Sequence, residues 1–169
     1  EVELLQLIHD LDIRTNSFGS RAKRGVRELF KTTLIKSFLS SPAALLETVT
    51  KKIKDLEKSP QSDKSAEAQK AINALIDIKK GAEDLDDDFT RLDKLINFIK
   101  AEPATNDNKI VIFTERIATM KYVASRVLEE GLAKGSFDPK ADQQAPGTLL
   151  ATAHGGELDH DLNAIVKSF

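Results

Sequence analysis

Two short segments hold residue types that can bind phosphate. Thr114-Glu115-Arg116 follows one apolar run of the chain, and His154-Gly155-Gly156 follows another. A threonine hydroxyl, an arginine guanidinium and the free amides at a helix start can hold phosphate oxygens, while glycine permits close backbone approach. If both runs are strands of an open α/β sheet, both segments lie at its ligand-binding edge. Spacing alone favours an ordinary helix cap at Thr114 and an ordinary turn at the two glycines.

Metal-ligating residue types are present without a metal-binding pattern. His154, Asp159 and His160 are close in the sequence, but their spacing matches no common ligand set, and the chain has no cysteine. The acidic residues 86–88 lack the glycine and the terminal glutamate of a calcium-binding loop, so we interpret them as a solvated helix start. We therefore predict no metal site in this chain.

The motifs of several enzyme classes are absent from the sequence. There is no phosphate-binding P-loop, no Gly-x-Gly-x-x-Gly, no Gly-x-Ser-x-Gly and no His-Glu-x-x-His. His154 as a general base is the weakest hypothesis, since no second titrating group is placed to activate it. We predict no catalytic residue and no cofactor within this chain.

Composition indicates a soluble globular chain. The 169 residues carry 25 basic and 27 acidic side chains, a net charge of −2, which argues against a histone-like cloak of positive charge. Apolar residues are 40% and charged residues 31%, a mixture inconsistent with disorder along the whole length. No secretory signal or membrane-length apolar run is present, so we expect a cytoplasmic protein. The first residue is Glu1 rather than Met, so we expect an excerpt of a longer chain.

Helical periodicity dominates the first hundred residues. Apolar residues recur at helical intervals in five segments, which predict helices over about 1–12, 21–39, 42–58, 63–80 and 89–100. Ser40-Ser41-Pro42 is a helix-start signal, and Gly81 is expected to stop the fourth helix. The second helix is basic, and its Arg24, Arg27 and Lys31 either follow nucleic-acid phosphates or form a solvated face.

The pattern then changes to that of a strand followed by a helix. Residues 109–114 form a β-branched and aromatic run typical of a strand buried on both faces, and 116–130 are helical. After a long loop at 133–147, a second strand is expected at 148–153 and a last helix from Leu158. The predicted fold is therefore α/β overall: a mainly α-helical region, 1–104, followed by an incomplete parallel α/β sheet, 105–169.

Three segments together resemble superfamily 2 helicases, particularly the Swi/Snf-like bacterial DNA translocases. The run from Lys109 through Phe113-Thr114-Glu115 is similar to the motif that opens their second RecA-like lobe. His154-Gly155-Gly156, ahead of Lys167-Ser168-Phe169, is similar to the next motif. Phe38-Leu39-Ser40-Ser41-Pro42 resembles the Ser-Ser-Pro segment of the helices between their two lobes. The three matches occur in family order and cover most of the chain.

The resemblance implies a fragment of an ATP-driven motor on nucleic acid, with duplex DNA as the expected partner. Thr114, Arg116 and Thr119, with the amides around His154, Gly155 and Gly156, would contact the nucleic-acid backbone. ATP and Mg²⁺ would bind elsewhere in the parent protein, and the first RecA-like lobe would be a partner. The fragment alone is expected neither to hydrolyse ATP nor to bind it tightly.

Two departures from the family pattern are visible. The spacer 133–147 is longer than the family's usual one, and Asp161-Leu162-Asn163 stands where an arginine is often found. The alternative function is a helical protein-interaction domain with a small α/β binding module and no motor activity. Because two parallel strands make a poor core, the second half is expected either to be loosely ordered or to associate with a second copy.

Overall fold

The chain contains two compact units. The computed structural model describes residues 1–11, 23–58, 66–85, 88–105, 108–138, 148–154, 163 and 165–167. The first unit is Glu1–Phe89 and the second is Thr90–Phe169. The domains that the sequence predicts, 1–104 and 105–169, stay a prediction.

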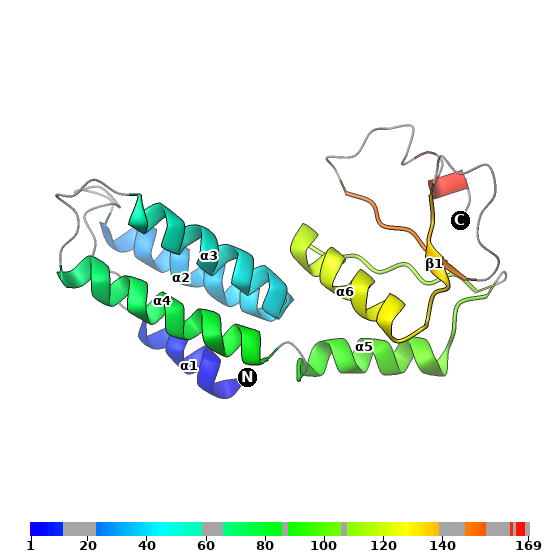
Figure 1. Cartoon of the computed structure of the whole chain (residues 1–169), viewed down its shortest axis with the longest axis horizontal. Coiled ribbons are helices and arrows are strands. Elements are labelled where there is room, and N and C mark those ends of the chain that lie inside the picture. Colours follow the sequence, from blue (N-terminus) through cyan, green and yellow to red (C-terminus); the bar gives the residue numbers. More distant parts are fainter. Residues whose placement is uncertain are drawn as a thin grey trace. The chain divides into compact units, whose positions relative to one another are not determined.

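The first unit is built from four helices (Figure 1). They are α1 (Val2–Asp10), α2 (Lys23–Ser40), α3 (Pro42–Glu57) and α4 (Ala66–Asp84). The principal packing interactions join α1 to α2, α2 to α3, α3 to α4, and α4 back to α1. The four helices therefore form a closed cycle, in which each helix packs on two neighbours and turns its apolar stripe inward.

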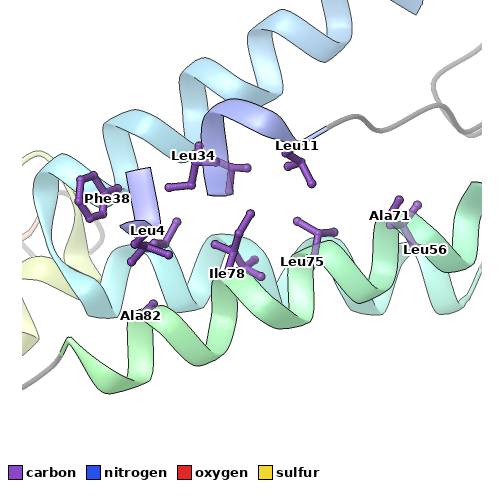
Figure 2. Packing of buried hydrophobic residues seen from close by; sticks show 12 residues of the cluster. Leu4, Leu11, Leu34, Phe38, Leu56, Ala71, Leu75, Ile78 and Ala82 are labelled. Atoms are coloured by element: carbon purple, nitrogen blue, oxygen red, sulfur yellow. The ribbon is translucent and has the colours of Figure 1, made fainter. Parts of the chain in front are cut away.

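The core of this unit consists almost entirely of aliphatic side chains. Figure 2 shows Leu4, Leu34 and Ile78 together, from α1, α2 and α4 respectively. On α1 the buried residues are Leu4 and Ile8 with Leu11 just beyond, while the other large apolar residues of this helix are exposed. A single stripe is buried because one face of α1 meets its neighbours. The large apolar side chains of this unit that are 0% exposed among the described residues are Ile8, Leu34, Leu45, Val49, Leu75 and Ile78.

The Ser40-Ser41-Pro42 prediction is confirmed. Ser41 is the N-cap of α3, its Oγ accepts a 3.0 Å hydrogen bond from the Ala44 amide, and Pro42 opens the helix. A second hydroxyl contact joins α2 to α3, because Ser37 Oγ and Thr48 Oγ1 lie 2.9 Å apart. Ser37 and Ser41 are both buried. The tight α2–α3 connection thus satisfies its buried polar groups locally.

Gly81 does not end α4 as predicted. The helix continues through it to Asp84. A Cβ at position 81 would lie 3.0 Å from Leu4 Cδ1 and 3.8 Å from Leu4 Cγ, so the glycine permits a close approach of α1 to α4. The prediction failed because glycine occurs both at helix ends and where two helices approach closely. The sequence alone does not distinguish these two cases, since the second depends on tertiary packing.

The second unit contains α5 (Thr90–Ala101) and α6 (Ile117–Glu129). The helix expected over 116–130 is confirmed, and so is its end at Gly131. Gly131 has φ +67°, its amide donates to Leu128 O, and the Leu132 amide donates to Val127 O. This double hydrogen bond needs a left-handed residue, which glycine adopts without steric cost. Lys100 Nζ lies 2.8 Å from Glu130 Oε2 and ties α5 to the end of α6.

The predicted α/β fold is wrong. The described residues are mostly helical, and their one sheet consists of two parallel strands of two residues each, β1 (Gly135–Ser136) and β2 (Leu149–Leu150). Gly135 pairs with Leu149 and Ser136 with Leu150. Within the described residues, the RecA-like parallel sheet expected over 105–169 is therefore not formed.

Most of this error concerns the strand expected at 109–114. These residues belong to no helix or strand, and Val111 is 57% exposed, Ile112 37% and Phe113 93%. Residues 133–147, expected as a loop, instead provide β1, and only Leu149–Leu150 of the expected second strand are in the sheet. The apolar run indicates residues that favour a buried strand. A strand is buried only where neighbouring strands pair with it, and no described strand pairs with 109–114.

The last predicted helix falls mainly on residues outside those described. Asn163 and residues 165–167 are helical, while 155–162, 164 and 168–169 lie outside the described residues.

We predict that Ser41→Ala lowers the free energy of unfolding by about 1–2 kcal/mol, because it leaves the Ala44 amide of α3 without its acceptor in a buried setting. Thr32→Ala is the matched control: its hydroxyl donates to Glu28 O on an exposed helix face, and its loss should cost no more than about 0.5 kcal/mol. Urea unfolding followed by circular dichroism measures both. Equal losses in the two variants would contradict the capping role.

The Lys100–Glu130 pair predicts a pH-dependent contribution to stability. The hydrogen bond from Lys100, followed by its charge, lowers the pKa of Glu130 below its ordinary value of 4.5. Because the pKa is lower in the folded state, the stabilisation is complete above the unfolded-state pKa. It is lost as pH falls through the folded-state pKa.

We expect Lys100→Met to return the Glu130 pKa upward and to reduce the loss of stability on acidification. Carboxyl NMR titration and unfolding at neutral and acid pH measure the two effects. Lys94→Met, on an exposed position of the same helix, is the control. A Glu130 pKa that does not move in Lys100→Met would show that the pair is absent in solution.

Candidate functional site

The start of α6 brings two predicted phosphate-binding residues together. Arg116 is the N-cap of α6, with φ −126° and ψ 136°, and its side chain makes no capping hydrogen bond. Thr114 Oγ1 donates to Arg116 O at 3.1 Å, and Thr114 is exposed. The first turn of α6 contains no acidic residue. The positive end of the helix dipole therefore begins at a cationic residue, and no carboxylate belongs to that first turn.

Thr119 differs from the other two residues of the motif. It lies in the first turn of α6, but it is buried, with 7% of its surface exposed. The next buried residues of the helix are Tyr122 and Val127. The structure thus places Thr119 in the packing of α6, while Thr114 is exposed and Arg116 is half-buried.

The second predicted segment is described only in part. His154 follows β2 by four residues and is half-buried. Gly155 and Gly156 lie outside the described residues, so their predicted contacts with nucleic acid stay predictions. Thr148 Oγ1, just before β2, donates to Ala104 O at 3.2 Å and joins the start of this strand to the segment after α5.

The basic helix α2 contains a lysine with a clear structural role. Lys31 Nζ donates to His9 O at 2.8 Å, and His9 is in the last turn of α1. A cation at this place neutralises the negative end of the α1 dipole and satisfies a carbonyl that the helix cannot. Arg24 and Arg27 lie within α2, but their side chains are outside what the structure describes.

Two further groups modify the electrostatics of the helical unit. Lys52 Nζ lies 5.6 Å from the centroid of the Phe30 ring, and desolvation lowers the pKa of Lys52 while the charge of Asp55 opposes that shift. Hydrogen bonds from Gln6 and then His9 lower the pKa of Asp10, with the Lys31 charge adding to the effect. Lys31 is thus integrated with the end of α1 through both a hydrogen bond and an electrostatic contact.

The described part of the chain offers no constellation for a metal ion. Within it, no group of three His, Cys, Asp or Glu side chains is placed to hold one. No helix in the described ranges is long and apolar enough to cross a membrane.

Sequence reasoning missed one surface feature. Val111 and Phe113 are among the most exposed apolar residues described, directly ahead of Thr114. The signal was present in the sequence as a continuous β-branched and aromatic run, but it was interpreted as a buried strand. The same pattern can mark a strand that needs a partner from another chain.

Comparisons with protein-family models, with curated proteins and with solved structures find no match to this chain.

We predict that Lys31→Met lowers the free energy of unfolding by about 0.5–1.5 kcal/mol, because it removes the donor to the last turn of α1. Lys36→Met, an exposed lysine on the same helix, should change stability by less than about 0.5 kcal/mol. Thermal unfolding measures both variants. If both variants melt at the same temperature, the Lys31–His9 contact contributes nothing to stability. Lys31 would then be available to a ligand.

Proposed function

We propose that this chain is part of an ATP-driven, helicase-like nucleic-acid translocase, to which it contributes backbone contacts and coupling between lobes. ATP hydrolysis would belong to other parts of the parent protein, where ATP and Mg²⁺ would bind. The support is the order of three sequence motifs and the geometry at the start of α6. The proposal does not include a RecA-like sheet, because the described residues form only one pair of two-residue strands.

The arrangement of Thr114 and Arg116 is the observation that carries this proposal. Arg116 caps α6 through its backbone only, and Thr114 lies two residues earlier with its hydroxyl held at the same turn. A phosphate placed there would meet a guanidinium and the amides of a first helical turn, and the Thr114 hydroxyl would donate to it only by giving up its bond to Arg116 O. Such a contact is independent of base sequence, as a motor that steps along a strand requires.

The experiment is duplex DNA binding by fluorescence anisotropy at several salt concentrations. We expect Arg116→Gln to weaken binding and to reduce the slope of log K against log salt by about 0.9, one phosphate contact. Lys121→Gln is the matched control, since this exposed lysine lies further along the same helix. The purified chain should show no ATP hydrolysis. An unchanged slope in Arg116→Gln, or ATP turnover that persists after contaminants are excluded, would contradict the proposal.

A second function is favoured by the surface of the helical unit. Val2 is 82% exposed on α1 and Leu29 is 66% exposed on α2, and a docked protein could cover these large apolar side chains. We propose docking of another protein at these helices as the alternative, with no motor activity. Absence of salt-dependent DNA binding by the unaltered chain would favour this alternative.

A further inference from the structure

Residues 109–115 have the composition of a strand and the exposure of a surface segment. Val111 and Phe113, two residues apart, are 57% and 93% exposed, whereas Ile110 is half-buried and Ile112 is 37% exposed. The alternation means that one side of the segment is open and the other is partly covered. No backbone hydrogen bond joins 110–113 to any other described residue.

We propose that this segment pairs with the same segment of a second copy, as two antiparallel strands related by a two-fold axis through Ile112. The proposal goes beyond the proposed function, since no nucleic acid takes part in it. Unpaired amides and carbonyls next to exposed β-branched side chains are the usual template for strand addition from another chain. A two-fold arrangement uses one patch on both copies and closes at the dimer.

The sequence of the segment is complementary to itself in this orientation. With Ile112 opposite Ile112 of the other copy, Val111 faces Phe113 and Ile110 faces Thr114. Lys109 then faces Glu115, so opposite charges meet at both ends of the paired region. Aromatic with β-branched pairs and opposite-charge pairs are the combinations that stabilise antiparallel strands. A parallel pairing would instead place Lys109 beside Lys109 and Glu115 beside Glu115.

The open side of the segment becomes covered in such a dimer. Val111 and Phe113 of both copies would lie on one face of the paired strands, in a cluster of four apolar side chains. The interface is short, so we expect weak, concentration-dependent self-association, as in small and transient contacts.

The test uses the residue on the two-fold axis, which meets its own copy. Ile112→Lys places two ammonium groups opposite each other, and Ile112→Glu places two carboxylates there. Each variant should weaken self-association several-fold, because like charges directly opposite are destabilising. An equimolar mixture of the two variants should dimerise again, because opposite charges then meet across the axis.

Sedimentation velocity over a range of concentrations measures the association, and circular dichroism verifies that each variant keeps its helix content. The matched control is the same pair of substitutions at Phe98, which is 55% exposed on α5 of the same unit. Those variants should associate like the unaltered chain.

A charge exchange provides a second measurement that leaves Ile112 intact. Lys109→Glu alone should weaken the dimer, and Lys109→Glu combined with Glu115→Lys should restore it. A monomer at every concentration, an open series of larger aggregates, or variants at Ile112 and Phe98 that behave alike would each overturn the proposal.

Discussion

The helical unit depends on the burial of one apolar stripe from each of four helices at once. A short helix such as α1 is marginal by itself, so its stability must come from Leu4 and Ile8 packing on α2 and α4. The closed cycle of contacts makes the helices mutually dependent. Gly81 is part of this arrangement, since α4 can approach Leu4 closely only without a side chain at that position.

Polar contacts adapt the ends of the helices to this packing. Ser41 satisfies an amide of α3 at a buried turn, and Lys31 satisfies a carbonyl at the end of α1. Both contacts place a polar group where a helix leaves backbone atoms unpaired. The basic character of α2 therefore has a structural component, the contact of Lys31 with the end of α1.

The sequence predicted the helical unit well, because its helices are specified by local patterns. Apolar periodicity identified the helices, and the Ser41-Pro42 pair identified the start of α3. The second unit was predicted less well for a physical reason. A parallel strand is stabilised by partners distant in the sequence, so the run 109–114 indicates a preference for a sheet without determining whether one forms. Even Gly81, a local signal, was misinterpreted because its role depends on Leu4.

In the candidate site too, local sequence predicts some features, and others depend on tertiary packing. Thr114 and Arg116 were identifiable because they precede a strongly periodic helix, and a helix start fixes their relative placement. The burial of Thr119 was not identifiable, because a threonine in a first turn faces solvent or protein according to what packs on the helix. His154 and Thr114 are far apart in the sequence, so only tertiary packing decides whether the two segments lie together. What the described residues supply for a phosphate at Thr114 and Arg116 is one helix start and one arginine side chain. Such a site is suited to a weak, salt-sensitive contact rather than to tight recognition.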